Sequence, residues 1–336
     1  MNTSLYFVGI DVAKLKLDIA LLKNGKTKTK VFGNSAEGFQ LLQQWLIAQQ
    51  LTPESTKLCL EATGAYSETI ALFLIEQGWC VSVVNPARVK GFAQSELARN
   101  KTDRADAALL ARFCAALQPE PWQAPPLAYR QLRAWVERLA ALKDMHQQEA
   151  NRQEAMHSSG QAAVSAHIQS HLDWLATEIA KLETEIDDHI DGHPELKTDA
   201  ELMRSIPGFG ARTVAKLLAY AGNVRQFQNA KALAAYAGVT PRQHQSGSSV
   251  MGRSMLSRAG DAKLRHALYM PGLVARRHNP TLKGFGDRLK DNGLAPKAVI
   301  GAVMRKLLHI IYGVITSGKP FQANFASPRL DLQDGI

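Results

Sequence analysis

Residues 5–32, LYFVGIDVAKLKLDIALLKNGKTKTKVF, decide the fold of the N-terminal part of the chain. The run 5–11 is apolar and ends in a carboxylate, and 16–22 alternates before it becomes continuously apolar. Asn24-Gly25 then precedes a short β-rich segment at 27–32, and this dipeptide is a strong hairpin signal. The stretch therefore predicts three antiparallel strands.

Helices and further strands are predicted to alternate after this stretch. Ser35 is a typical N-cap for a helix through about residue 50, and a second helix is expected at 67–77. Strands are predicted at 57–61 and 80–84, with helices after them to about residue 117. Three strands followed by this alternation predict a mixed α/β sheet with one antiparallel edge.

Four prolines at 119–126 mark the first boundary, because no helix interior tolerates them. The pattern at 129–190 is helical, with a break at 158–160 that predicts an antiparallel helical hairpin. Residues 137–199 carry 13 acids against 5 bases, which favours a coiled-coil or dimer-forming spacer over a nucleic-acid surface. Short helices are expected beyond it, with a loop at 238–252.

These patterns predict an α/β plus α chain in three parts. The expected parts are a mixed-sheet domain, a helical coiled-coil spacer and a mostly helical C-terminal domain, at 1–120, 121–195 and 196–325. The length of 336 residues agrees with more than one domain at roughly 150 residues each.

The positive charge is concentrated toward the C-terminus. Residues 1–200 hold 20 Lys/Arg and 24 Asp/Glu, a net charge of −4, whereas 201–336 hold 20 and 6, a net +14, which together give the total of +10. A polyanion such as nucleic acid is the simplest partner for the C-terminal part. A basic surface that only keeps the protein soluble is the alternative.

Composition excludes several classes of protein. With 46% hydrophobic and 21% charged residues, a disordered chain is not expected. Three cysteines without metal-type spacing argue against a disulfide scaffold or zinc module and fit a reducing compartment, so we expect a cytoplasmic protein. The longest apolar stretch near the C-terminus, 298–304, is far short of the ~20 residues of a membrane span, and the start lacks a signal-peptide pattern.

Four carboxylates stand where strands and a helix are expected to meet. Asp11 and Glu61 each end a predicted apolar strand, and Asp103 and Asp106 share one face of a helix if Thr102 is its N-cap. Such a group is tolerable only around a cation, and oxygen ligands suit Mg²⁺ or Mn²⁺. One or two such ions would support phosphoryl transfer.

Other interpretations of these acids remain open. Acids in the first turn of a helix also interact favourably with its dipole. The order of an acid after strand one, an acid after strand four and a helical pair resembles the ribonuclease-H-like layout of RuvC-type nucleases. The start GIDVAK at 9–14 also resembles sugar kinases of the actin-like ATPase group, but the sequence lacks the second Gly-rich phosphate loop that they require.

Residues 205–215, SIPGFGARTVA, resemble a helix-hairpin-helix. Gly208 and Gly210 permit a tight turn whose backbone N–H groups meet a phosphate, with Arg212 and Lys216 nearby. The same pattern also serves as a plain turn between helices.

A serine-containing polar loop, GVTPRQHQSGSS at 238–249, follows this hairpin. A serine in such a loop is usually only solvated, and an adjacent histidine such as His244 is commonplace. A basic stretch surrounds the loop, however, and covalent attack on phosphate needs cations beside a serine. Its candidate nucleic-acid-binding residues are Arg242, Arg253, Arg258, Lys263 and Arg265.

The motifs occur in a specific order. They are GIDVAK at 9–14, EATGAY at 61–66, VNP at 84–86, KTDRADA at 101–107, PGFG at 207–210, GVTPR at 238–242 before SG at 246–247, and GDAKLR at 260–265. This set resembles the DEDD-type insertion-sequence recombinases, the insertion-sequence one-ten family related to the Piv DNA invertases. The resemblance runs from about residue 5 to about residue 320.

The resemblance implies an active site. It assigns Asp11, Glu61, Asp103 and Asp106 as Mg²⁺ ligands of a RuvC-like domain. It assigns Ser246, the serine before Gly247, as a nucleophile that forms a phosphoserine link with DNA in the C-terminal transposase domain. Ser248 and Ser249 lie close to it in the sequence, and the roles of His244 and Gln245 stay open.

The resemblance also implies partners. A bridge RNA encoded beside the gene would guide the protein to donor and target DNA, and the protein would act as a dimer to tetramer. An active site in this family combines a RuvC-like and a transposase domain from different protomers. The expected function is Mg²⁺-dependent excision and integration of an insertion sequence. The alternatives are a junction-resolving nuclease that uses metal-activated water, and a non-catalytic nucleic-acid-binding or partner-binding protein.

Overall fold

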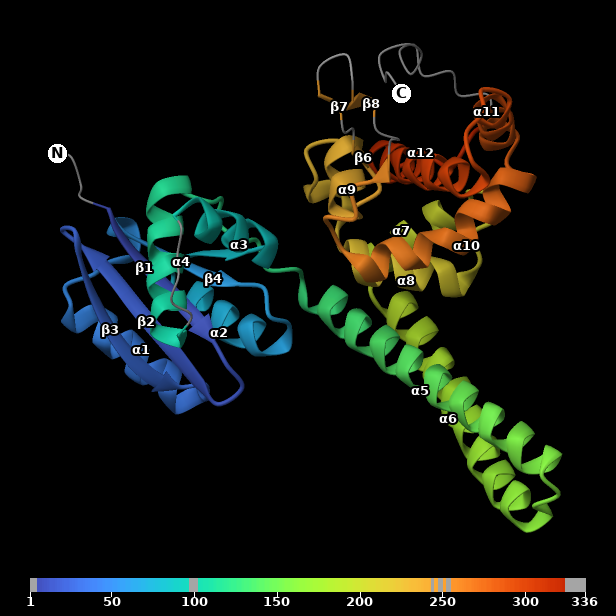
Figure 1. Cartoon of the computed structure of the whole chain (residues 1–336), viewed down its shortest axis with the longest axis horizontal. Coiled ribbons are helices and arrows are strands. Elements are labelled where there is room, and N and C mark those ends of the chain that lie inside the picture. The colour runs from blue at the N-terminus through green and yellow to red at the C-terminus, as the bar shows by residue number, and fades with distance from the viewer. Residues whose placement is uncertain (1–4, 97–101, 243–244, 247–249, 252–254, 324–336) are drawn as a thin grey trace. The chain divides into compact units, whose positions relative to one another are not determined.

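The computed structural model describes residues 5–96, 102–242, 245–246, 250–251 and 255–323. The chain divides into two compact units, Met1–Ala124 and Pro125–Ile336. We call these the N-terminal unit and the C-terminal unit, and Figure 1 shows the elements of each.

A five-stranded mixed sheet forms the centre of the N-terminal unit. Its strand order is β3-β2-β1-β4-β5; β1 is antiparallel to β2 and parallel to β4, so the predicted mixed sheet is confirmed. Asn24 and Gly25 both have positive φ, 52° and 72°, as a tight hairpin turn requires. The strands are β1 (Tyr6–Val12), β2 (Lys16–Lys23), β3 (Lys26–Gly33), β4 (Thr56–Glu61) and β5 (Cys80–Val84).

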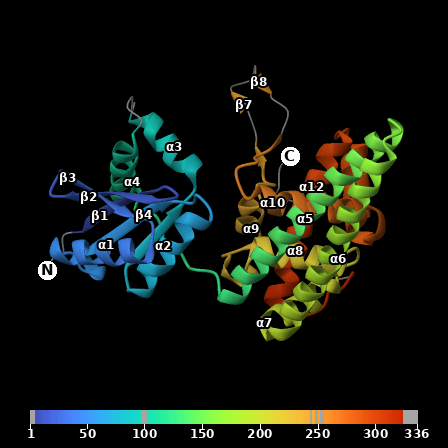
Figure 2. The ribbon, with the colours of Figure 1, turned by 90° about the horizontal axis from the view of Figure 1, so that it is seen from below.

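Helices cover both faces of this sheet, as Figure 2 shows. The helices α1 (Ala36–Ala48) and α2 (Ala65–Glu76) lie on the face to which Ile10 and Leu60 contribute core side chains. The helices α3 (Pro86–Ser95) and α4 (Asp103–Leu117) cover the other face. A short 3₁₀ turn at Pro53–Ser55 leads into β4.

Gly9 sets the distance between α4 and the sheet. A Cβ atom at this position would lie 2.0 Å from the carbonyl oxygen of Ala107 and 2.4 Å from the amide nitrogen of Ala111. The helix backbone therefore lies directly on β1, which only glycine allows. Because side chains alternate along a strand, Asp11 lies on this same face, under the first turns of α4.

The C-terminal unit is almost wholly helical. A long antiparallel hairpin, α5 (Leu127–Ser158) and α6 (Ala162–Gly192), turns at Gly160 with φ 74°. Side chains at the base of this hairpin belong to the same apolar cluster as the helices after it. Those helices are α7 (Pro194–Arg204), α8 (Ala211–Ala221), α9 (Ala230–Tyr236), α10 (Ala262–His278), α11 (Pro280–Asp291) and α12 (Pro296–Ser317), with a 3₁₀ turn at Val224–Gln226.

Helix α12 differs from the sequence expectation. Among the described residues it is long and apolar enough to cross a membrane by length and composition, with a mean hydropathy of 1.7, although no such segment was expected. More than half of that stretch, 56%, is buried inside the unit, where Val303, Leu307 and Ile311 pack in the core. Its apolar character is therefore that of a core helix.

Two other expectations for this unit were wrong. Helices α10 and α12 have 17 and 22 residues and are not short. The expected loop at 238–252 contains three short strands, β6 (Pro241–Arg242), β7 (Gln245–Ser246) and β8 (Val250–Met251). Strand β7 pairs with β8, and β6 pairs with β9 (Met255–Leu256), which follows the expected loop. Strands of two residues are too short for a periodic pattern, so the sequence could not indicate them.

Candidate functional site

The sheet brings Asp11 and Glu61 to one edge. Strands β1 and β4 are parallel neighbours with Ile10 opposite Leu60, so the next residue of each strand is one of these two acids. Both carboxylates thus stand at the carboxyl ends of adjacent strands, as the sequence predicted.

Helix α4 supplies the other two predicted acids. The Thr102 side chain accepts a hydrogen bond of 3.2 Å from the Ala105 amide, so α4 begins at Asp103 and holds Asp103 and Asp106 in its first turn. The predicted N-cap and the shared first turn are both present. The position of this turn over Asp11 depends on the close approach of α4 at Gly9.

The four predicted carboxylates interact electrostatically. The pKa of Asp11 is raised to about 6, first because the carboxyl is half-buried and then because of the negative charges of Asp106, Asp103, Asp18 and Glu61. Four acids on β2, β4 and α4 therefore add to the effect of burial on Asp11, which marks this residue as a candidate for a functional role.

Asp18 and Lys16 were missed by the sequence analysis. Asp18 on β2 lies directly opposite Asp11 on β1 and is only 4% exposed. The Lys16 Nζ atom lies 3.0 Å from Asp18 Oδ2 and 2.5 Å from Asp103 Oδ2. A carboxylate inside the otherwise apolar run LDIALL was the signal, because a buried acid needs a partner.

The predicted ligands are of the chemical type that divalent cations bind, although the structure does not gather them into a closed group. Carboxylate oxygens are the ligands that Mg²⁺ and Mn²⁺ prefer. Within the described ranges, however, no three Asp, Glu, His or Cys side chains are gathered closely enough to form a ready-made metal group. Two features agree with this spacing: the negative charges of the acids repel one another, and Asp103 forms an ion pair with Lys16.

In the C-terminal unit, the predicted helix-hairpin-helix joins α7 to α8. Gly208 has φ 95°, and a Cβ there would lie 2.9 Å from the Val274 side chain, so this glycine serves both the turn and the packing on α10. Gly210 is the N-cap residue of α8. The turn has the form expected for a phosphate contact, and that role stays a prediction.

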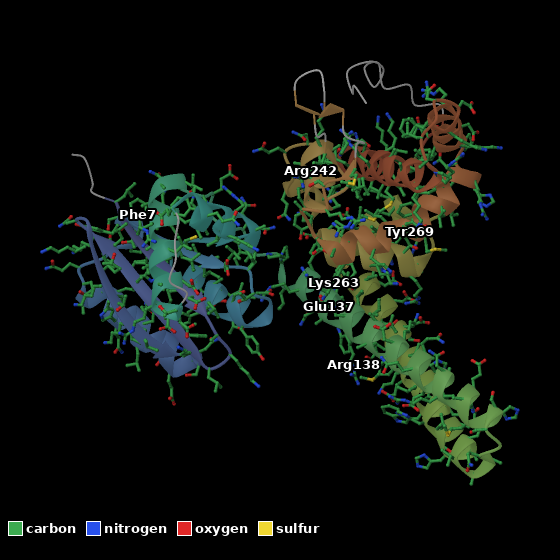
Figure 3. The ribbon with its side chains drawn as sticks, in the orientation of Figure 1. Phe7, Glu137, Arg138, Arg242, Lys263 and Tyr269 are labelled. Carbon is green, nitrogen blue, oxygen red and sulfur yellow. The ribbon has the colours of Figure 1, made fainter. Side chains whose placement is uncertain are left out.

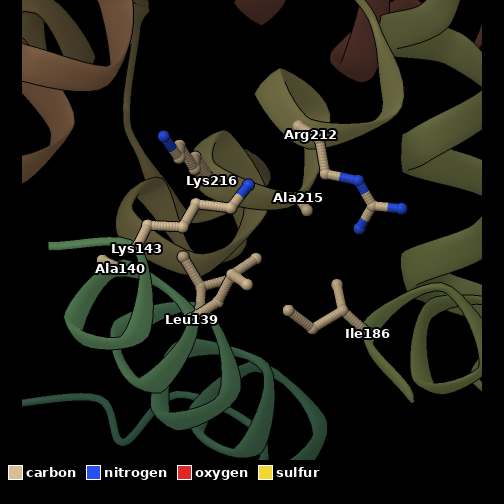
Figure 4. A pocket seen from close by; sticks show the side chains of 8 residues that line it. Leu139, Ala140, Lys143, Ile186, Arg212, Ala215 and Lys216 are labelled. Atoms are coloured by element: carbon tan, nitrogen blue, oxygen red, sulfur yellow. The ribbon is translucent and has the colours of Figure 1, made fainter. Parts of the chain in front are cut away.

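Arg212 is bound within the unit. Its guanidinium pairs with Asp187 and donates a hydrogen bond of 3.1 Å to the Glu183 carbonyl, both on α6. With Lys143 and the exposed Lys216 it surrounds a small hollow between α5, α6 and α8 (Figure 4). The apolar floor of this hollow includes Leu139, Ile186 and Ala215.

The other predicted basic residues divide into two groups. Arg242 on β6 and Arg258 after β9 are exposed. Lys263 on α10 forms an ion pair of 2.6 Å with Glu137 on α5, and Figure 3 labels both residues. Arg265 donates a hydrogen bond of 3.2 Å to the Ala237 carbonyl. Arg253 lies outside the described residues.

Ser246 is the last residue of β7, and its backbone pairs with Val250 on β8. The position of its hydroxyl is not described, and His244, Gly247, Ser248 and Ser249 lie outside the described residues. The nucleophile therefore stays a prediction from the sequence.

Comparison with known proteins finds relatives over most of the chain. A family model for DEDD transposases of the IS110 type matches residues 8–157, and the model described as "Transposase IS116/IS110/IS902 family" matches residues 200–287. The chain is 36% identical over 316 residues to the pilin gene-inverting protein of Moraxella lacunata, which covers 94% of this chain and 97% of that protein. The corresponding protein of Moraxella bovis is 35% identical over the same length.

A more distant relative is a transposase. The chain is 31% identical over 131 residues to the transposase for insertion sequence element IS1111A of Coxiella burnetii, which covers 32% of this chain and 35% of that protein. The matched DEDD domain implies dependence on a divalent metal ion, in agreement with the acidic site. The chain therefore belongs to the IS110 family of DEDD transposases, enzymes that cleave and rejoin DNA.

Proposed function

We propose that this chain is an RNA-guided DNA recombinase that excises and integrates an insertion sequence. In this proposal Asp11, Glu61, Asp103 and Asp106 hold Mg²⁺, with Mn²⁺ as a possible substitute, and Ser246 is the nucleophile. The observation that supports it is the placement of the four acids: Asp11 and Glu61 follow paired residues of the neighbouring strands β1 and β4, and Asp103 and Asp106 stand in the first turn of α4, which packs on β1.

In this proposal the carboxylates act by concentrating negative charge where the ends of β1 and β4 meet the first turn of α4. Burial and like-charge repulsion make the ionised cluster unfavourable by itself, so the free energy of that repulsion favours binding of a cation. When bound, the ion supplies charge stabilisation for the departing oxygen and activation of the attacking one. Helix α4 and strands β1 and β4 hold the ligands on rigid elements.

The proposed serine step conserves the energy of the phosphodiester. The Ser246 oxygen attacks phosphorus and loses its proton, the phosphorus–oxygen bond to one DNA strand breaks, and the departing DNA oxygen takes up a proton. A hydroxyl of another strand then attacks the phosphoserine, forms a new phosphodiester and returns the serine hydroxyl. Arg242 and Arg258, both exposed, would balance the phosphate charge during these steps.

The partners follow from the same family resemblance. We propose DNA, a guide (bridge) RNA and further copies of the chain as a dimer to tetramer, in which the α5–α6 hairpin is the assembly element. A cytoplasmic location, at the nucleoid during reaction, fits these partners. A non-coding stretch beside the gene that folds into an RNA with two loops would support the guide, and its absence would argue against it.

The decisive experiment captures the covalent intermediate. On a DNA substrate that traps cleaved strands, the wild-type chain should form a protein–DNA adduct, and Ser246→Ala should abolish the adduct while leaving RNA binding intact. Ser249→Ala is the matched control for the same loop and should leave the adduct in place. An undiminished adduct in Ser246→Ala would overturn the serine assignment.

The same experiment separates the alternatives. Asp11→Ala and Asp103→Ala should each remove most of the activity, because each removes a ligand. DNA cleavage without any adduct, unaffected by Ser246→Ala, would instead identify a junction-resolving nuclease that uses water. Nucleic-acid binding with no product, indifferent to chelation of divalent ions, would identify a binding protein.

Inversion of a DNA segment is a second candidate activity. It is favoured because the two pilin gene-inverting proteins match over 94% of this chain, whereas the matched transposase covers about a third of it. Inversion and excision use the same cleavage and joining chemistry and differ in the relative orientation of the two sites. Plasmids with paired sites in inverted and in direct orientation would distinguish them by the products formed.

A further inference from the structure

Lys16 lies among the acids of the candidate site, and the proposed mechanism gives it no role. Its ammonium contacts Asp18 Oδ2 at 3.0 Å and Asp103 Oδ2 at 2.5 Å. Lys16 and Asp18 are two residues apart on β2, so they share one face of the sheet, and Asp18 lies opposite Asp11. The ammonium thus connects β2 to the first turn of α4.

The two contacts of Lys16 differ in their exposure to solvent. The Asp18 side chain is 6% exposed, and a buried carboxylate is costly without a cationic partner. The Asp103 side chain is 54% exposed, so water or another cation can replace the ammonium there at little cost. The contact with Asp18, here called the inner contact, therefore holds the Lys16 side chain in place. The contact with Asp103, here called the outer contact, can be exchanged for water or another cation.

Both groups of the outer contact are charged. The hydrogen bond from Lys16 lowers the pKa of Asp103, and the hydrogen bonds to Asp103 and Asp18 raise the pKa of Lys16. The pair is therefore an ammonium and a carboxylate at neutral pH. The same carboxylate is one of the four acids proposed to hold the metal.

We infer that Lys16, anchored on Asp18, is a built-in cation of the acidic cluster that competes with the divalent ion for Asp103. Lys16 is a positioning residue: without the ion it keeps α4 and Asp103 in place against charge repulsion, and it weakens binding of the ion that displaces it. This inference rests on the proposed function, because it needs Asp103 as a ligand.

The test measures Mn²⁺ binding to the full chain by paramagnetic resonance of the free ion. Lys16→Gln should tighten Mn²⁺ binding by about three- to tenfold at low salt, since it removes one nearby competing positive charge. Lys26→Gln removes the same charge from an exposed position on β3 and should leave the affinity unchanged. Lys16→Arg keeps the cation and should bind Mn²⁺ no more tightly than the wild type.

A second measurement, without metal, tests the positioning role. In the presence of a chelator, Lys16→Gln should lower the melting temperature, because the acids lose their internal cation, whereas Lys26→Gln should not. Lys16→Arg should retain most of the stability and so serves if Lys16→Gln folds poorly. An affinity in Lys16→Gln equal to or weaker than that of Lys26→Gln would overturn the inference.

The contribution of Asp103 is isolated by a double-mutant cycle. If competition acts through this contact, Lys16→Gln should tighten Mn²⁺ binding less in an Asp103→Asn background than in the wild type. An equal gain in Mn²⁺ affinity in both backgrounds would show that Lys16 does not compete with the ion through Asp103.

Failure of the inference can be distinguished from failure of the proposed function. Asp106→Asn removes a proposed ligand and should weaken Mn²⁺ binding in every background. If wild-type protein and Asp106→Asn bind Mn²⁺ equally, the metal site itself is misplaced and both proposals fail. If Asp106→Asn weakens binding but Lys16→Gln changes nothing, the metal site stands and only the role of Lys16 is rejected.

Discussion

At the scale of single residues, Asp11 is the most informative side chain of the site. Its pKa of about 6 means that the folded protein holds a proton which the unfolded chain, with a pKa near 3.8, has already released. The contribution of Asp11 to stability is therefore fully present below the unfolded pKa of 3.8 and is lost as the pH rises through about 6. A bound cation would reverse this effect, because it favours the ionised form.

Asp11→Asn should accordingly stabilise the metal-free protein at neutral pH. We expect a gain of about 1 kcal/mol at pH 7.5, after a discount for the half-exposed carboxyl, and almost no gain at about pH 2.5, well below 3.8, where Asp11 is protonated in both states. Thermal unfolding in chelator at the two pH values measures this difference. A lower stability of Asp11→Asn at pH 7.5 would show that the repulsion inferred for Asp11 is absent.

Single residues also show the reach of sequence reasoning. Asp11, Glu61, Asp103 and Asp106 could be found because each stands at the end of a strand or in the first turn of a helix, positions that local patterns mark. The partnership of Lys16 with Asp103 spans 87 residues of sequence and depends on how closely α4 approaches the sheet, which no local pattern encodes.

At the scale of elements, the approach of α4 to β1 determines where Asp103 and Asp106, two of the four proposed ligands, lie. Gly9→Ala would place a methyl group 2.0 Å from a backbone oxygen of α4, so the helix must shift as a body. We expect a loss of about 3 kcal/mol in the free energy of unfolding and weaker Mn²⁺ binding, measured by urea unfolding and metal titration.

Gly91→Ala is the matched control for this substitution. Gly91 lies inside α3 of the same unit, and a Cβ there would have open space around it. We expect a gain of about 0.5–1 kcal/mol from improved helix propensity. Equal effects of the two substitutions would contradict a special role for the contact at Gly9.

The elements that sequence analysis recovered are those with strong periodic patterns and capping residues. Strands β1 to β5 and the helix start at Thr102 belong to this group. The pairing of β6 with β9 and of β7 with β8 was missed, because these strands are two residues long and are held by contacts rather than by propensity. The apolar length of α12 was underestimated because Arg305 and Lys306 interrupt it in sequence, although both are half-buried residues of one continuous helix.

At the scale of the whole molecule, the charge imbalance predicts how DNA binding responds to salt. Residues 201–336 carry a net +14, and each phosphate contact that is lost reduces the slope of log affinity against log salt by about 1. Arg242→Gln and Arg258→Gln, at exposed positions, should each produce this reduction. Lys263→Gln should produce less, since its ammonium is paired with Glu137, and an equal effect of all three would contradict this division.

The two units also predict the calorimetric behaviour of the chain. Each has its own apolar core, so we expect two unfolding transitions. Mn²⁺ should raise the melting temperature of the N-terminal unit only, because all of the proposed ligands belong to that unit. At a Mn²⁺ concentration a hundred times the dissociation constant, the free energy of unfolding of that unit should increase by about 2.7 kcal/mol. Asp106→Asn should reduce this shift and leave the other transition unchanged. If Mn²⁺ raised the melting temperatures of both units, or only that of the C-terminal unit, the metal would bind outside the acidic edge of the sheet.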